Sequence, residues 1–207
     1  YYLGTNEYRD GTLSPSGFVH LETFRLEEGF PVFTYHLGGL NGIMLEKRIW
    51  MQEGRNTTFI QYRALRTTSP EQSTCSANGT TRPLSNSRYQ DYAEAAQASL
   101  SLTLLPLSTN RPHTMCQGTD DHRQFYVQQL RADDGSGDET ATLPRGAAGC
   151  MIRTGDDVSP YAILAVGQPE NHATFLPTGV WYWNFLRRMD AQAGRPATDD
   201  LYLPGVI

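Results

Sequence analysis

Acidic pairs are the residues of this sequence that could most readily do chemistry. Neighbouring acidic residues recur at positions 27–28, 120–121, 133–134, 156–157 and 199–200. Glycoside hydrolysis needs two carboxyl groups held roughly 5 to 10 Å apart across a sugar cleft. Adjacent aspartates in turns, by contrast, are usually solvated turn formers and caps. No position stands out as a general acid in an apolar pocket, so the sequence predicts no complete active site.

Metal, nucleotide and nucleophile motifs are equally lacking in the sequence. His113 and His122 flank a segment with Cys116, Asp120 and Asp121, which could supply metal ligands, but the spacing matches no recognised site. The chain contains no GxGxxG, P-loop, HExxH or CxxC motif, and no Gly-x-Ser-x-Gly turn to present a nucleophile. We therefore expect neither a metal nor another cofactor.

Residues 30–65 predict the central element, three antiparallel strands joined by turns at 37–42 and 53–56. In the middle strand the apolar side chains alternate with polar ones, and Lys47 interrupts the apolar face. One face of this sheet is therefore expected on a core and the other partly in water.

The rest of the chain predicts further short strands and little helix. Strands are expected at residues 18–27, 99–107, 122–131, 149–154 and 159–167, and residues 201–207 read as the entry to another. Residues 1–17 are rich in turn formers, and residues 67–98 read as a long polar insertion loop. Helical spacing of Trp181, Phe185, Arg188 and Met189 predicts one helix over 180–193. The pattern indicates one all-β antiparallel sandwich domain over residues 1–207, with one short helix near the C-terminus.

Composition excludes several classes of function. The net charge of −5 disfavours a nucleic-acid binder and a polybasic membrane patch, and no apolar run is long enough to span a bilayer. Three widely spaced cysteines fit a reducing compartment, so a cytoplasmic location is expected. The chain opens without Met or a signal peptide, which suggests a fragment lacking its first strands.

Several sequence blocks carry a family resemblance. They are LGTN at 3–6, GFVHLETFRL at 17–26, PVFTY at 31–35, LEK at 45–47, RNTTFIQYRAL at 55–65, WYWNF at 181–185 and DLYLPG at 200–205. In this order they resemble the N-terminal domain of bacterial and archaeal glycogen debranching enzymes. Where that family usually has Arg-Asp-x-His, this chain has Arg111-Pro112-His113, without the acidic residue.

The resemblance implies a galactose-mutarotase-like β-supersandwich that precedes a helical catalytic domain of the same polypeptide. The whole enzyme would be an amylo-α-1,6-glucosidase that acts on the α-1,6 branches of glycogen-like glucans. Its catalytic carboxylates would lie in the helical domain, so this chain alone is expected to be inactive and to help in substrate recognition.

Four residues are candidate contacts to such a glucan. Arg111 and His113 could donate hydrogen bonds to sugar hydroxyls, while Trp181 and Trp183 could stack on sugar rings. The alternatives are an exposed loop and aromatic packing within the sandwich. At the level of function, a free-standing carbohydrate-binding module that uses exposed tryptophans, including Trp50, and a purely structural sandwich that docks on a partner remain open.

Overall fold

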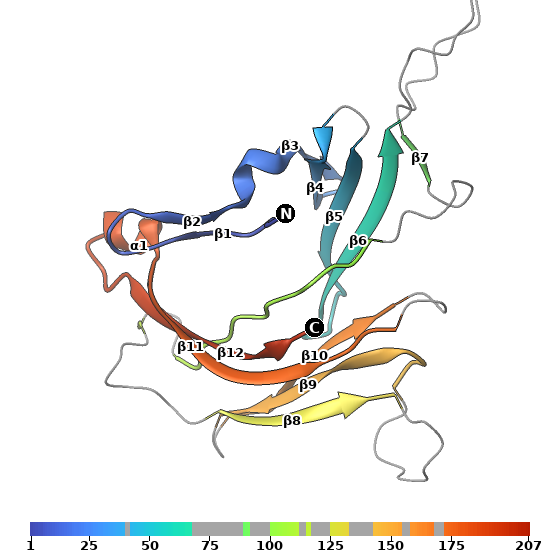
Figure 1. Ribbon diagram of the computed structural model, residues 1–207. Helices are drawn as coiled ribbons and strands as arrows, with labels where there is room; N and C mark the ends of the chain where they lie inside the picture. Colours follow the sequence, from blue (N-terminus) through green and yellow to red (C-terminus); the bar gives the residue numbers. More distant parts are fainter. Residues whose placement is uncertain are drawn as a thin grey trace, which may run out of the picture. The chain divides into compact units, whose positions relative to one another are not determined.

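The computed structural model describes residues 1–39, 42–67, 89–91, 100–111, 115–116, 125–132, 143–154, 158–167 and 172–207. These residues are mostly β, and all pairings between their strands are antiparallel (Figure 1). They belong to two compact units. Unit 1 comprises Tyr1–Thr5 and Ser14–Leu100, and unit 2 comprises Asn6–Leu13 and Ser101–Ile207. The β-rich fold with a short helix is as expected, whereas the supersandwich arrangement and the single domain stay predictions.

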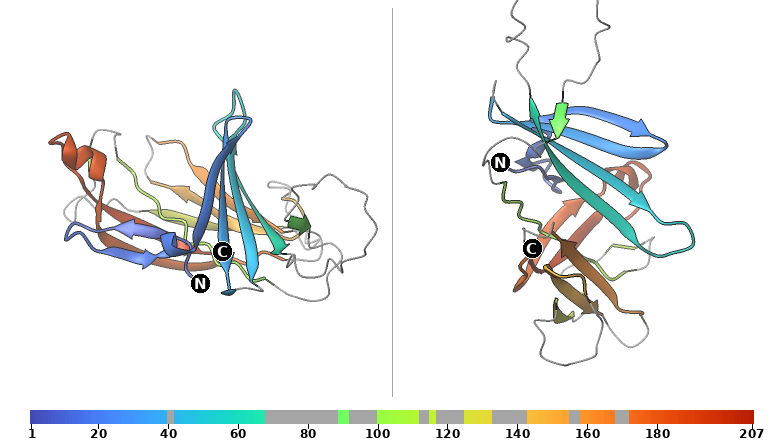
Figure 2. Two further views of the ribbon diagram at one scale, coloured as in Figure 1. Left: turned by 90° about the horizontal axis from the view of Figure 1, so that it is seen from above. Right: turned by 90° about the vertical axis from the view of Figure 1, so that its right-hand side faces the viewer.

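Unit 1 is built on the predicted three-stranded meander. β4 (Phe30–Leu37), β5 (Ile43–Met51) and β6 (Thr58–Thr67) lie between β3 (Leu21–Glu27) and β7 (Tyr89–Asp91), in the order β3-β4-β5-β6-β7 (Figures 1 and 2). Gly38 and Gly39 after β4, with φ of 91° and 74°, and Gly54 after β5, with φ of 71°, have the left-handed backbone that these turns require. The meander is therefore confirmed.

Burial in this sheet changes along the strands more than between its faces. Met44 and Leu45 point to opposite faces of β5, yet each is only 1% exposed. Met51, at the other end of the strand, is 58% exposed. The expected division into one buried face and one solvent-exposed face is therefore wrong. Both faces are buried at the Met44 end of β5, and the buried stretch ends on both faces at Lys47 and Arg48.

The beginning of the chain contains more regular structure than its turn formers suggest. β1 (Thr5–Glu7) pairs with β2 (Leu13–Ser16), and a 3-10 turn, η1 (Gly17–His20), precedes β3. The strand expected at 18–27 therefore begins only at Leu21. Gly17 is required here, because a Cβ atom on it would lie 2.4 Å from the carbonyl carbon of Leu3.

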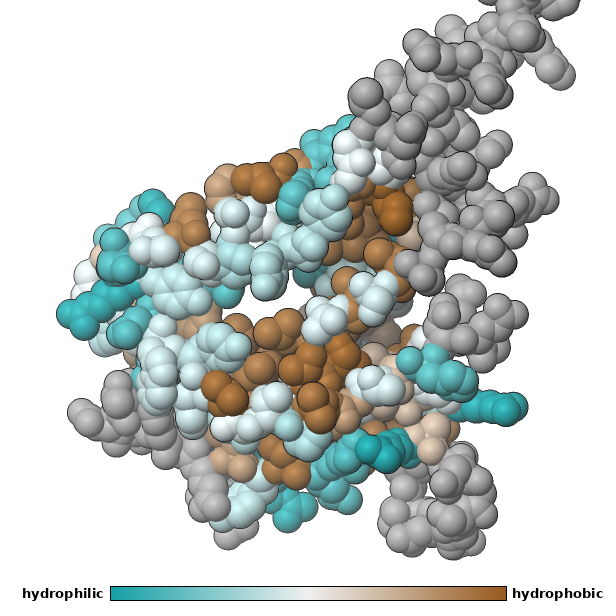
Figure 3. All heavy atoms as spheres, in the orientation of Figure 1, coloured by the Kyte–Doolittle hydropathy of each residue, from teal (hydrophilic) through white to brown (hydrophobic). Residues whose placement is uncertain are grey.

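Unit 2 contains two further sheets. β8 (Tyr126–Arg131), β9 (Ala147–Arg153) and β10 (Tyr161–Val166) form one in the order β10-β9-β8, which confirms the strands expected there. Its buried core consists of Ala148, Cys150, Ile152 and Phe175. In the space-filling view, hydrophobic side chains gather over the strands of unit 2 with hydrophilic ones toward the edges (Figure 3).

The helix expected over 180–193 is mostly wrong. β11 (Leu176–Leu186) occupies its first half and pairs with β12 (Thr198–Val206) in a long curved hairpin (Figures 1 and 2), and α1 spans only Arg188–Gln192. Aromatic residues favour strands, and pairing with β12 outweighs the helical spacing. The strand expected from residue 201 is present, since residues 201–206 belong to β12.

Residues 99–107 do not form the strand that their alternating leucines predicted, as far as residues 100–107 are described. Pro106 cannot donate to a strand ladder. The segment is tied to β12 locally instead: Leu104 and Ile207 exchange backbone hydrogen bonds of 2.7 and 3.1 Å, and Ser108 and Tyr202 exchange two of 2.8 Å. Of the insertion loop expected at 67–98, only residues 67 and 89–91 are described, and residues 89–91 form β7.

Candidate functional site

A hollow of about 520 Å³ in unit 2 is lined by two aromatic residues and four polar ones. The lining residues are Tyr8, Arg9, Asp10, Thr12, Trp183 and Asn184. Trp183 is 45% exposed, and its ring offers an apolar face beside guanidinium, carboxylate and amide groups. Sugars present both C–H faces and hydroxyls, so this combination suits a carbohydrate ligand.

A tight turn supplies the polar side of the hollow. The amide of Tyr8 donates to the carbonyl of Thr12, and that of Gly11 donates to Tyr8, each over 2.9 Å. Asp10 accepts a 2.9 Å hydrogen bond from the amide of Thr12. This bond lowers the pKa of Asp10 below its ordinary value, so the carboxylate stays ionised at neutral pH. The turn therefore presents a fixed negative charge beside Arg9.

The turn is attached to β11 at an irregular point of that strand. Tyr8 forms an antiparallel bridge with Phe185, their rings stack with centroids 5.2 Å apart, and the amide of Arg9 donates to the carbonyl of Asn184 over 2.9 Å. Asn184 has a φ of 64° at a register shift between β11 and β12. The backbone amide of Asn184 donates over 2.9 Å to the carboxylate of Asp200, which is 3% exposed. A buried acceptor thus supports the backbone that carries Trp183.

An aromatic row stands behind Trp183. The rings of Trp181 and Trp183 stack with centroids 6.3 Å apart, because residues two apart share one face of a strand. Trp181 in turn contacts Tyr202 at 5.3 Å, and Tyr202 stacks on Phe125 at 4.5 Å. The row limits the rotation of Trp183, which lowers the entropy cost of placing a ligand on it.

A cluster of ion pairs surrounds Asp199, the neighbour of Asp200 on β12. The Asp199 carboxylate is 2% exposed, and its Oδ2 lies 2.7 Å from Arg111 Nη2 and 3.2 Å from Arg187 Nε. Arg187 also donates to the thiol of Cys116 over 3.0 Å, while Asp190 pairs with Arg187 at 3.2 Å and with Arg195 at 2.6 Å. Buried charges persist only when paired in this way, so the cluster holds together the loop at 111, the start of α1 and β12.

The predicted contact residues occupy different positions in this arrangement. Trp183 lines the hollow, Trp181 is half-buried behind it, and the side chain of Arg111 is 14% exposed and paired with Asp199. His113 lies outside the described residues. Their contact with sugar stays a prediction. The reasoning from sequence missed Arg9, Asp10 and Asn184, although the Asp-Gly turn and the WYWNF block mark them.

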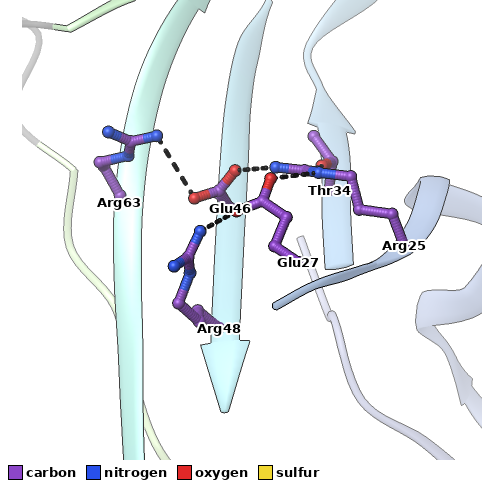
Figure 4. Close-up of polar contacts among 6 residues, drawn as sticks. All are labelled: Arg25, Glu27, Thr34, Glu46, Arg48 and Arg63. Carbon is purple, nitrogen blue, oxygen red and sulfur yellow. Dashed lines mark hydrogen bonds and ion pairs between the residues drawn. The ribbon is translucent and has the colours of Figure 1, made fainter. Parts of the chain in front are cut away.

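A second charged cluster lies on the sheet of unit 1 (Figure 4). Glu46 is 5% exposed and accepts from Arg25 at 2.6 Å and from Arg63 at 3.4 Å. Glu27 accepts from Arg25 at 2.6 Å and also from Arg48. These pairs link β3 to β5 across β4, and β5 to its neighbour β6. Each carboxylate is paired with two arginines. We therefore interpret the cluster as a structural link between strands, and neither glutamate as a general acid.

The buried carboxylates of unit 2 also have partners: Asp199 pairs with two arginines, and Asp200 accepts a hydrogen bond from a backbone amide. Within the described ranges, no group of three or more metal-ligating side chains is close enough to hold an ion. Nor does any helix there have the length and apolar character needed to cross a membrane.

Comparison with known proteins gives a family for the chain. The family model described as "Glycogen debranching enzyme N terminal" matches residues 1–207. No curated protein and no solved structure is significantly similar to the chain. Because the family model spans the whole sequence, the chain belongs to the family of N-terminal domains of glycogen debranching enzymes.

Proposed function

We propose that this chain recognises the glucan substrate for a debranching enzyme through the hollow beside Trp183. The substrate class is a glycogen-like α-glucan with α-1,6 branches. Membership of the debranching family supports the class of substrate. The observation that carries the proposal is the exposed, buttressed Trp183 ring next to Arg9, Asp10 and Asn184.

Each part of the hollow has a role in this proposal. The Trp183 face takes the C–H face of a glucose unit, which removes apolar surface from water. Arg9 donates to hydroxyl oxygens, Asp10 accepts from hydroxyl groups, and the Asn184 side chain can do either. The fixed turn and the bulge keep these groups in place before the ligand arrives, so little ordering is needed on binding.

In this proposal a helical catalytic domain of the same polypeptide carries out hydrolysis, and the enzyme acts in the cytoplasm. For the 207-residue chain itself we propose the galactose-mutarotase-like supersandwich arrangement. The 207-residue chain then releases no glucose from a glycogen limit dextrin. Glucose release by the chain alone would overturn this assignment. A free-standing binding module would bind glycogen equally well with or without a catalytic domain, whereas a recognition domain gains affinity when joined to one.

The test is affinity electrophoresis of the full chain in native gels that contain glycogen. We expect glycogen to retard the wild-type chain and Trp183→Ala to lose most of that retardation. Base-stacking measurements on aromatic side chains suggest about 1–3 kcal/mol per stacked ring, and a sugar ring should fall at the low end. Arg9→Gln should weaken retardation to a smaller degree.

Tyr126→Ala is the matched control, because Tyr126 is 55% exposed in unit 2 but does not line the hollow. It should leave retardation unchanged. Loss of retardation in this variant as well would mean that general surface aromatics, not the hollow, bind the glucan. Absence of retardation of the wild-type chain would favour the purely structural alternative.

A further inference from the structure

A second hollow, of about 420 Å³, lies in unit 2 and shares no lining residue with the Trp183 hollow. Its size falls in the range of small-molecule pockets, roughly 300–1,000 Å³. The buried lining is apolar: Ala147, Ala148 and Phe175 are 4%, 3% and 5% exposed. The exposed lining includes Arg131, Arg145, His172 and Thr174.

The ionisable side chains that the structure describes on this hollow are all basic. Among the described lining residues there are two arginines and a histidine and no acidic residue. Among the described residues, no carboxylate forms an ion pair with Arg131 or Arg145. The arginines of the two clusters above are, in contrast, all paired. Two guanidinium groups that converge on one hollow, neither of them paired with a described carboxylate, indicate a place for an anion.

Backbone and side-chain hydrogen bonds fix the three segments that form the hollow. The side-chain amide of Gln129 on β8 donates to the carbonyl of Phe175 over 3.1 Å. The amide of Ala173 donates over 3.0 Å to the carbonyl of Gly146, whose φ of 77° shapes the turn before β9. The amide of Ala132 donates to Ala147, also over 3.0 Å. The end of β8, the start of β9 and residues 172–175 are therefore tied to one another.

We propose that this hollow binds a small phosphate monoester. The planar guanidinium group has donors spaced to bind two phosphate oxygens at once, and Thr174 adds a hydroxyl donor. A phosphate monoester carries nearly two negative charges at neutral pH, which suits two arginines better than a single carboxylate would. The apolar floor accommodates the organic part of the ester. This site is separate from the glucan surface, and neither depends on the other.

The test is isothermal titration of the full chain, at about 0.15 M salt so that diffuse attraction is screened. The probes are glucose 6-phosphate, inorganic phosphate and glucose. We expect saturable binding of both phosphates that Trp183→Ala leaves unchanged, whereas any binding of glucose itself should be lost in Trp183→Ala. Arg131→Gln and Arg145→Gln should each weaken glucose 6-phosphate binding about tenfold or more, because each removes a charge-assisted hydrogen bond.

Arg153→Gln is the matched control. Arg153 is exposed at the opposite end of β9, carries the same charge, and does not line the hollow. It should bind glucose 6-phosphate like the wild type. Equal weakening in this variant, or no saturable binding of glucose 6-phosphate by the wild type, would overturn the proposal. Arg131→Lys, which keeps the charge, should bind between the wild type and Arg131→Gln. Glycogen retardation should be unchanged in all of these variants, so a failure here is distinct from a failure of the glucan site.

Discussion

Arg111 and Asp199 form an ion pair with 2.7 Å between Nη2 and Oδ2, and their side chains are only 14% and 2% exposed. The pair joins two segments that are far apart in the sequence, the loop after residues 100–107 and the start of β12. Arg187 shares the same carboxylate oxygen at 3.2 Å. Asp199 is therefore the common partner of two cations.

The first prediction concerns the loss of that common partner. Asp199→Asn should lower the free energy of unfolding by about 3 kcal/mol, because the largely buried Arg111 would lose the Asp199 carboxylate and Arg187 would lose one of its two carboxylate partners. Urea denaturation followed by tryptophan fluorescence measures the change. Glu7→Gln is the control, since its partner Arg188 is 63% exposed and such pairs contribute little. Equal stability of Asp199→Asn and wild type would show that the cluster does not hold the segments together.

Much of the fold follows from local sequence signals. Glycine turns and alternation predict β4, β5 and β6, because those signals act within a few residues. The apolar side chains of the Trp181–Phe185 segment fit both the helical period of about 3.6 and the strand period of about 2, so local spacing also permits the helix predicted there. Its strand state depends on β12, which local pattern cannot reveal. The hollow beside Trp183 was not predictable for the same reason, as its polar wall comes from residues 8–12.

The second prediction concerns acid. The Arg25 hydrogen bond lowers the pKa of Glu27 below its ordinary 4.5, and the charges of Arg25 and Arg48 act in the same direction. Stability from this group is thus fully present above about pH 4.5 and is lost as pH falls through the lower folded-state pKa. Glu27→Gln should flatten the fall in stability between about pH 5 and pH 3. Urea midpoints across that range, compared with Glu22→Gln, measure the effect. Parallel curves for Glu27→Gln and wild type would contradict it.

The third prediction concerns the bulge that carries Trp183. Asn184→Ala should destabilise the chain by about 1 kcal/mol, because a φ of 64° disfavours a residue with a Cβ and without a polar side chain. Asn184→Gly should be tolerated, since glycine adopts positive φ without strain. Thermal unfolding compares the two. Equal losses in the two variants would mean that the Asn184 side chain, which both lack, and not the backbone conformation, matters there.

The fourth prediction concerns the Cys150 thiol. Burial raises its pKa to about 11, so at about pH 8 the thiol stays protonated and inert. Iodoacetamide should modify it only after unfolding, while the partly exposed Cys116 reacts in the folded chain. Mass spectrometry of digested samples locates the label. Rapid labelling of Cys150 in the folded chain would show that the β8-β9-β10 core opens readily.

Unit 2 consists of two segments that are far apart in the sequence, residues 6–13 and 101–207, so its parts become available at different times during synthesis. Glu7 pairs with Arg188, 181 residues later in the chain, and Tyr8 bridges to Phe185. All strands of the unit 1 meander are synthesised well before β11. The meander can therefore fold while residues 6–13 still lack their partner strand. Contacts this distant in sequence form slowly, and the wall of the Trp183 hollow should be among the last parts of the molecule to close.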